Sequence, residues 1–191
     1  MSTDQLTGFE RQQLLALARQ SIELATRQQP MPELQLSEYS PALQENGASF
    51  VTLTKKDGSL RGCIGTLTAY QPLVQDVCEH AVAAALEDFR FQPVQQMEVA
   101  HLQIEISRLT PSQSLDYANC QDLPGLLRPG VDGVVLRDGV RRATFLPQVW
   151  EKLPEPEDFL TNLCWKMGAA GDLWRSKKLD VEIYQVEEFH E

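Results

Sequence analysis

Apolar residues recur every three or four positions in several stretches of the chain, which is the period of an α-helix with one buried face. The first stretch predicts a helix over residues 8–28, opened by the capping-box pair Thr7 and Glu10. A shorter stretch near the carboxy terminus predicts a helix over residues 157–167, and Gly168 supplies its carboxy-terminal cap.

A further helix is predicted to open at Pro72, a residue that suits the first turn of a helix. Its apolar face is very broad and extends to Phe89, so we expect this helix to be largely buried. Its narrow polar edge is predicted to hold Asp76 and His80.

Short runs rich in apolar and β-branched residues predict the strands. These strands are residues 49–55, 60–67, 101–109, 133–137, 140–146 and 180–189. Asp57-Gly58 and Asp138-Gly139 are expected to close two hairpins, because Asp-Gly supplies the positive φ that tight turns need. Two hairpins, a lone strand and a closing strand, with helices between them, predict an α+β fold in which a mixed or mostly antiparallel sheet packs against helices.

The composition narrows the classes of function. A formal net charge of −10 at pH 7 argues against sequence-independent nucleic-acid binding, which depends on clustered Lys and Arg. No apolar run approaches the roughly 20 residues of a membrane span, and the amino terminus lacks the pattern of a secretory signal. We therefore expect a cytoplasmic protein with no membrane partner and with free thiols. The spacing of Cys and His predicts no metal site, and Cys78 and Cys164 are expected in the core.

The predicted strand L-R-G-C-I-G-T-L carries the most suggestive side chains. In a regular strand Arg61, Cys63 and Gly65 point to one face, while Gly62 and Ile64 point to the other. A guanidinium near a cysteine favours the nucleophilic thiolate, and glycine inside a strand often marks a bulge or the close approach of a ligand. The alternative interpretation is that the glycines only let a helix pack closely, with Cys63 as a buried filler and Arg61 exposed.

The same strand is one of several motifs that resemble a known family. The motifs are LRGCIGTL, DFRFQP, LQIEISRLTP, RRATFLPQVW and EDFLTNLCWKMG, in the family's order. By these motifs the chain resembles the AMMECR family and, more narrowly, its bacterial branch, called AmmeMemoRadiSam system protein A. The match runs from the first helix to Phe189, so we expect residues 7–189 to form a single AMMECR-type domain that folds as one cooperative unit.

The resemblance implies an AMMECR-like fold of two lobes with a cleft between them, where the R-G-C-I-G segment lies. It also implies two candidate partners, a Memo-like protein related to extradiol dioxygenases and a radical S-adenosylmethionine (SAM) protein, and it assigns neither a reaction nor a cofactor. On these motifs we predict Cys63 and Arg61 as catalytic residues, an unknown small molecule as ligand, and no metal. The predicted ligand-binding residues are Gly62, Ile64, Gly65, Asp88, Arg90 and Thr144.

Asp88 and the histidines have structural interpretations as well. Asp88 follows a buried helix and is expected to pair with Arg90 or Arg61, because a buried carboxylate requires a partner. Such an ion pair would serve to lock the helix end as readily as to catalyse a reaction. The three histidines, His80, His101 and His190, are too dispersed to predict a metal triad.

Three hypotheses on function stay open at this point. The first is an enzyme that uses Cys63 as a thiolate and Arg61 to orient an anionic substrate group. The second is a non-catalytic module that binds a small molecule or a partner protein. The third, RNA binding, is disfavoured by the acidity and by an aromatic content of only 7%. The sequence shows no general base next to Cys63, and Glu105 is assigned to the solvated face of its strand.

Overall fold

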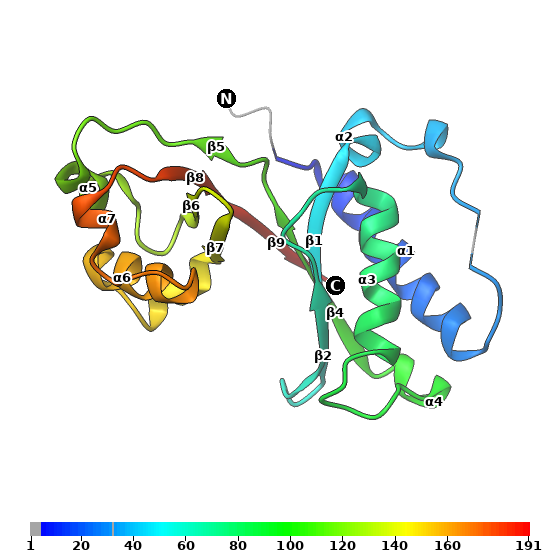
Figure 1. The fold of residues 1–191 in the computed structure, drawn as a ribbon. Coiled ribbons are helices and arrows are strands. Elements are labelled where there is room, and N and C mark those ends of the chain that lie inside the picture. The colour runs from blue at the N-terminus through cyan, green and yellow to red at the C-terminus, as the bar shows by residue number, and fades with distance from the viewer. Residues whose placement is uncertain (1–4, 32) are drawn as a thin grey trace. The chain divides into compact units, whose positions relative to one another are not determined.

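A computed structural model of the protein describes residues 5–31 and 33–191. Residues 1–4, part of the amino terminus considered above for a secretory signal, lie outside the described residues. The chain forms two compact units (Figure 1), which are described separately. Unit 1 comprises the residues up to Leu109 together with Glu187–Glu191, and unit 2 comprises Thr110–Val186. Both combine helices with antiparallel strands, which confirms the predicted α+β class. None of the helices in the described ranges is long and apolar enough to cross a membrane.

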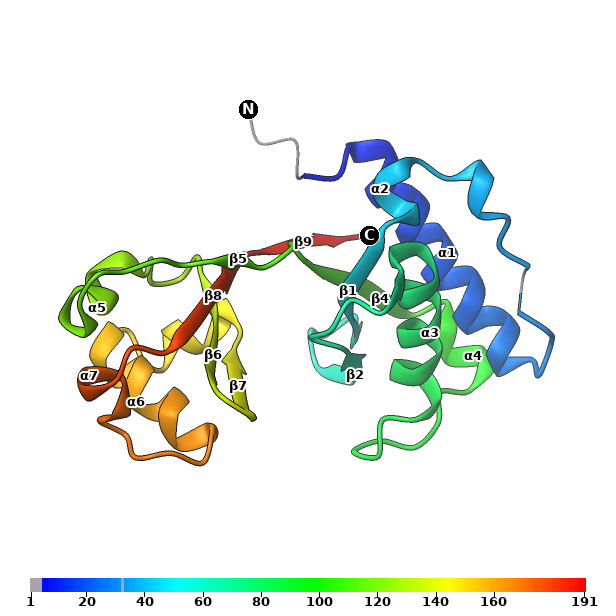
Figure 2. The ribbon, with the colours of Figure 1, turned by 45° about the horizontal axis from the view of Figure 1, so that its top comes forward.

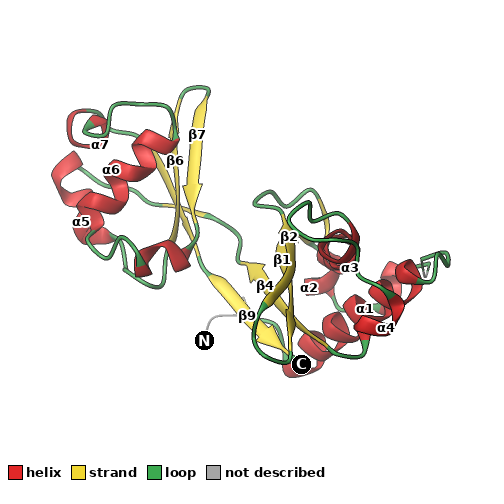
Figure 3. Cartoon of the chain, turned by 90° about the horizontal axis from the view of Figure 1, so that it is seen from below, coloured by secondary structure: helices red, strands yellow, loops and turns green. Residues whose placement is uncertain are grey.

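Unit 1 is a sheet with helices on one face, as Figure 3 shows. Its strands follow the order β2-β1-β4-β9, with the short β3 beside β1. They are β1 (Asn46–Lys55), β2 (Leu60–Gly65), β3 (Gln71–Pro72), β4 (Leu102–Leu109) and β9 (Val186–His190). The predicted first hairpin is confirmed, with Gly58 at a φ of 81° in its turn. β2 is thus an edge strand, and it ends two residues before the predicted Leu67.

The helices of unit 1 are α1 (Gly8–Thr26), α2 (Pro41–Gln44), α3 (Leu73–Leu86) and α4 (Gln96–Val99), with a 3-10 turn at Leu36–Glu38. The capping box of α1 is confirmed, since the Thr7 hydroxyl accepts a hydrogen bond from the Glu10 N–H and the Glu10 carboxylate accepts one from the Thr7 N–H. Pro72 caps α3, which packs between α1 and the sheet. The core of unit 1 forms where these two helices meet the inward residues of β1 and β4.

The predicted polar edge of α3 is wrong at two positions. Asp76 is fully buried and His80 is 6% exposed, because both belong to a polar network that faces β1. The Ser49 hydroxyl donates to Asp76 Oδ2 at 2.6 Å, and His80 Nδ1 lies 3.1 Å from the same oxygen. The predicted apolar face is also wrong at its end, since α3 stops at Leu86 and the Phe89 side chain is 93% exposed.

Unit 2 contains a second sheet, in the order β5-β8-β6-β7 (Figure 2). Its strands are β5 (Gln113–Ser114), β6 (Gly133–Asp138), β7 (Arg141–Phe145) and β8 (Asp180–Tyr184). Its helices are α5 (Leu123–Leu126), α6 (Pro156–Lys166) and α7 (Leu173–Ser176), with 3-10 turns at Cys120–Asp122 and Pro147–Glu151. The second hairpin and the short helix are confirmed, with positive φ at Gly139 and at Gly168. The core is centred on Phe159, whose ring stacks on Trp150 at 3.7 Å between centroids.

The predicted closing strand over residues 180–189 is two strands instead of one. β8 belongs to the sheet of unit 2 and β9 to the sheet of unit 1, and only Gln185 separates them. At this break Gln185 O accepts from the Thr110 N–H, while its own N–H donates to Thr110 Oγ1. The chain therefore passes from unit 1 to unit 2 and back again. Folding of residues 7–189 as one cooperative unit remains a prediction.

Candidate functional site

Arg61 does not share a face with Cys63, because β2 contains an irregularity at Arg61 itself. The Cα partners across the hairpin are Thr52↔Cys63, Leu53↔Gly62 and Thr54↔Leu60. Arg61 is thus the extra residue of a β-bulge, which interrupts the strict alternation of side chains between faces. Its guanidinium runs to Glu98 of α4, in the helix layer of unit 1. The prediction that Arg61 shares a face with Cys63 is wrong.

The Arg61 side chain holds α4 against the edge strand. Arg61 Nε and Nη2 each donate to a Glu98 carboxylate oxygen at 3.1 Å, and Arg61 is only 7% exposed. This guanidinium, with the Gln95 N–H, lowers the pKa of Glu98 below its ordinary value. Arg61 Nε and Nη2 are thus committed to a structural ion pair, while Nη1 is buried without a hydrogen-bond partner among the described residues. The ion pair does not favour the predicted catalytic role of Arg61.

The two glycines of the strand serve close packing. A Cβ on Gly62 would overlap the Ala84 carbonyl oxygen of α3, and one on Gly65 would overlap the Phe50 ring and the Ser49 carbonyl oxygen. The space beside Gly65 is filled by Phe50 and not left for a ligand, so the interpretation of these glycines as packing residues is favoured. Ile64 packs against the unit 1 core, again as a structural residue.

Asp88 and Arg90 close the free edge of β2 at Cys63. The Cys63 N–H donates to Asp88 Oδ2 at 2.9 Å, and Arg90 Nη2 donates to the Cys63 carbonyl oxygen at 3.1 Å. Arg90 Nε and Nη2 also donate to the two Asp88 carboxylate oxygens, at 2.8 and 2.6 Å. The expected ion pair of Asp88 is therefore confirmed, with Arg90 as its partner. These contacts lower the pKa of Asp88 well below its usual range, the Arg90 hydrogen bonds being the largest cause.

The Cys63 thiol lies on the face of the sheet opposite α3. Its partner Thr52 lies between the inward-facing, buried Val51 and Leu53, so Thr52 and Cys63 both point to the other face. The Thr52 hydroxyl donates to Cys63 Sγ at 3.3 Å, and the thiol is half-buried. The pKa of Arg90 is raised, first by the Asp88 carboxylate and further by the Cys63 thiol. The cation bound to Cys63 is thus Arg90, whose Nη2 donates to the Cys63 carbonyl oxygen and whose side chain is 45% exposed.

Other titratable groups lie further from the sulfur. Thr52 pairs on its other side with Glu105 of β4, so Cys63, Thr52 and Glu105 form one row across three strands. His80 belongs to α3, on the opposite face of the sheet. No group of three or more His, Cys, Asp or Glu side chains that could hold a metal ion occurs within residues 5–31 and 33–191.

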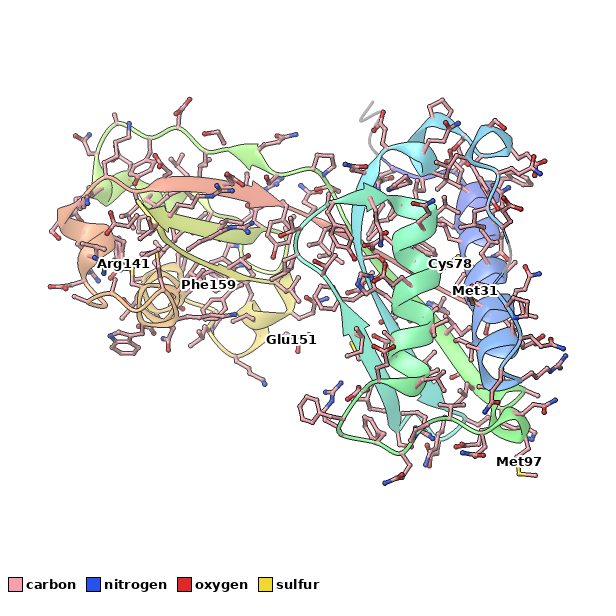
Figure 4. The ribbon with its side chains drawn as sticks, turned by 45° about the vertical axis from the view of Figure 1, so that its right-hand side comes forward. Met31, Cys78, Met97, Arg141, Glu151 and Phe159 are labelled. Carbon is pink, nitrogen blue, oxygen red and sulfur yellow. The ribbon has the colours of Figure 1, made fainter. Side chains whose placement is uncertain are left out.

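The other cysteines differ from Cys63. Cys78 and Cys164 are buried, as predicted, and burial raises the pKa of both thiols. Figure 4 labels Cys78 on α3, in the helix layer of unit 1. Cys120 is half-buried in the 3-10 turn of unit 2. Cys63 is thus the half-buried cysteine of unit 1, with a hydroxyl at its sulfur and a guanidinium at its carbonyl oxygen.

Thr144 belongs to β7 of unit 2, where its hydroxyl lies 3.0 Å from the Tyr184 hydroxyl. Its carbonyl oxygen accepts a hydrogen bond from Lys166 Nζ at 2.9 Å. Both contacts lie within unit 2. That Thr144 binds a ligand together with the R-G-C-I-G segment remains a prediction, and so does the cleft.

Sequence reasoning missed Thr52 and Glu98, the partners of Cys63 and Arg61. The pairing of Thr52 with Cys63 could have been predicted, because counting residues outward along both strands from the Asp57-Gly58 turn places Thr52 opposite Cys63. The pairing of Glu98 with Arg61 had no signal in the sequence, because the bulge that turns Arg61 towards α4 depends on the three-dimensional fit of β2 against its neighbours.

A family model, related sequences and a solved structure each match nearly the whole chain. The AMMECR1 family model matches residues 15–189. A protein of Methanothermobacter thermautotrophicus is 37% identical over 188 residues, which cover 97% of this chain and 96% of that protein. Protein SSO0193 of Saccharolobus solfataricus is 36% identical over 177 residues, covering 90% of this chain and 77% of the relative. The crystal structure of uncharacterized protein PH0010 from Pyrococcus horikoshii has a TM-score of 0.77 and 31% identity, covering 97% of this chain and 93% of that one.

Proposed function

The chain belongs to the AMMECR1 family, and from that premise we propose that Cys63 is a reactive thiol with which the domain captures an electrophilic ligand. The observation that carries the proposal is the Thr52 hydroxyl, which donates to the sulfur, together with the Arg90 guanidinium, which binds the carbonyl oxygen of the same residue. In general, a hydrogen-bond donor and a nearby cation favour negative charge on a sulfur atom, and the thiolate is the form that attacks electrophiles. Arg90 thereby takes the role that the sequence assigned to Arg61.

Arg90 also supplies a site for an anionic group of the ligand. Its Nε and Nη2 groups are used by Asp88 and by the Cys63 carbonyl oxygen, whereas Nη1 makes no hydrogen bond to an oxygen atom of the described residues. Because Asp88 fixes the guanidinium plane, Nη1 is held in a defined place. A carboxylate or phosphate near the reacting atom of the ligand would fit this arrangement.

We further propose that the domain acts in a pathway with a Memo-like protein and a radical SAM protein. Support comes from the resemblance to the bacterial AmmeMemoRadiSam system protein A branch, although the relatives reported above are archaeal. The exposed Phe89, next to Asp88 in the loop that closes β2, offers an apolar contact for such a partner. Affinity purification with the two proteins of the same organism should retain one of them on the wild-type chain and less on Phe89→Ser.

The competing function is a non-catalytic binding module in which Cys63 only lines a wall. A time course of iodoacetamide alkylation near pH 7, read by mass spectrometry on the native protein, separates the two. We expect Cys63 to be labelled before Cys120, and Cys78 and Cys164 only after unfolding, because burial shields these two thiols. If Cys120 is labelled first and Cys63 only in denaturant, the thiol proposal fails and the binding module replaces it.

A further inference from the structure

A cavity in the helix layer of unit 1 lies apart from the Cys63 thiol. It has a volume of about 380 Å³ and lies between α3 and the loop that follows α1. Two of its lining residues, Met31 of the loop and Cys78 of α3, are labelled in Figure 4. A volume of this size is typical of pockets that bind small molecules. Because α3 covers the sheet face opposite the Cys63 sulfur, a ligand in this cavity is independent of the proposed thiol chemistry.

One part of the lining is apolar and uncharged. Met31 and Leu34 contribute from the loop, and Cys78, Val82 and Ala83 contribute from α3. Burial raises the pKa of the Cys78 thiol, so this group carries no charge at neutral pH. Such a surface favours methylene groups of a ligand, because their removal from water lowers the free energy.

The polar part of the lining is acidic. It consists of Gln71, Gln75, Glu79 and Glu87, and no Lys, Arg or His belongs to the described lining. Gln71 Nε2 donates to Glu79 Oε2 at 2.6 Å, which orients that carboxylate, while Glu79 Oε1 accepts no hydrogen bond from a described residue. The Glu87 side chain has no hydrogen bond or ion pair with any of the described residues. Both carboxylates are therefore available to a cation from outside the chain.

The spacing of the two carboxylates indicates the shape of that cation. Glu79 and Glu87 are eight residues apart along α3 and its C-cap, which corresponds to about 12 Å along the helix axis. Val82 and Ala83, from the apolar part of the lining, lie between them in the sequence. A compact cation would reach only one of the carboxylates. A long unbranched chain with an ammonium group at each end would match both charges and the apolar surface between them.

We propose that this cavity binds a linear aliphatic amine with at least two ammonium groups, the chemistry of a polyamine. Its terminal ammonium groups pair with Glu79 and Glu87, and its methylene chain lies on Val82 and Ala83. The Gln75 carboxamide oxygen accepts a further N–H group of the amine. The net charge of −10 attracts such a cation to the protein from a distance.

The test is isothermal titration calorimetry with spermidine at low ionic strength, where exposed charges are least screened. We expect one saturable site in wild type. Glu79→Gln and Glu87→Gln should each lower the affinity about two- to fivefold, the usual range for one exposed ion pair. Glu151→Gln removes an exposed carboxylate from unit 2 and is the matched control, so its affinity should equal that of wild type.

Two diamines of equal charge separate the cavity from general attraction to an acidic protein. Octamethylenediamine is long enough to reach both carboxylates, whereas putrescine is too short, so the longer diamine should bind more tightly. Equal affinities for the two diamines would overturn the inference. Absence of a saturable site in wild type, or equal losses in Glu79→Gln, Glu87→Gln and Glu151→Gln, would overturn it as well. These results leave the Cys63 proposal untouched, because alkylation tests that proposal separately.

Discussion

At the residue scale, Asp88 joins groups that are far apart in the sequence. Its carboxylate accepts hydrogen bonds from the Cys63 N–H, from the Arg90 side chain and from the Arg90 N–H. The folded state therefore holds the pKa of Asp88 below the value of an unfolded chain. A carboxylate whose pKa is lowered on folding stabilises the folded state. This stabilisation is complete above the unfolded pKa of about 3.9 and is lost as the pH falls towards the folded pKa.

The first prediction is that Asp88→Asn loses stability at neutral pH but less in acid. At pH 7 we expect a loss of about 1–3 kcal/mol, the usual effect of removing hydrogen bonds to a charged group. Below about pH 4 the difference from wild type should shrink, because Asp88 of the unfolded chain then binds a proton while the folded carboxylate stays charged, and this lowers the stability of wild type. Urea unfolding at several pH values measures both effects. The exposed Asp116→Asn is the control, and a pH-independent difference for Asp88→Asn would contradict the assigned charge.

At the element scale, β2 pairs with β1 and packs against α3, and it carries glycine at one close approach to each of them. The second prediction concerns Gly62, where an added Cβ would overlap the Ala84 carbonyl oxygen, a backbone atom that cannot rotate away. Gly62→Ala should destabilise the protein by about 1–3 kcal/mol or more, as overpacking of a core does. Gly8→Ala, at an open helical position, is the control and should be neutral or stabilising. Equal stabilities of the two variants in urea would refute the packing role of Gly62.

The same elements show what a sequence can predict. The hairpins, the capped first helix and the buried helix after Pro72 follow from local signals such as Asp-Gly turns, Thr7 with Glu10 and helical periodicity. The bulge at Arg61 has no local signal, and it alone moves the guanidinium from the thiol to Glu98. Asp76 was misplaced for a related reason: its buried position depends on Ser49 of β1, and helical periodicity contains no information on such tertiary partners.

At the scale of the whole molecule, the chain enters unit 2 once and returns once, so unit 1 is incomplete until β9 has formed. Glu187 of β9 accepts the Leu6 N–H and pairs with Arg11 of α1, which ties both ends of the chain into unit 1. The third prediction is that both units unfold in one transition. Since Trp150, Trp165 and Trp174 all belong to unit 2, tryptophan fluorescence reports that unit.

Circular dichroism at 222 nm supplies the second probe, because the long helices α1 and α3 belong to unit 1. Coincident urea transitions of the two signals are expected for one cooperative unit. Two separated midpoints would show that the units unfold independently and would contradict the predicted single domain over residues 7–189.

The most direct measurement is the rate of Cys63 alkylation by iodoacetamide near pH 7 in wild type, Arg90→Gln and Arg61→Gln. If Arg90 is the cation that stabilises the thiolate, its loss should slow Cys63 about fivefold, which corresponds to about 1 kcal/mol of screened charge interaction. Arg61→Gln should leave the rate within about twofold of wild type, because that guanidinium is bound to Glu98. Circular dichroism confirms that each variant is folded under the conditions of the assay. A large decrease in Arg61→Gln together with an unchanged rate in Arg90→Gln would contradict the assignment of Arg90 as the partner of the thiol.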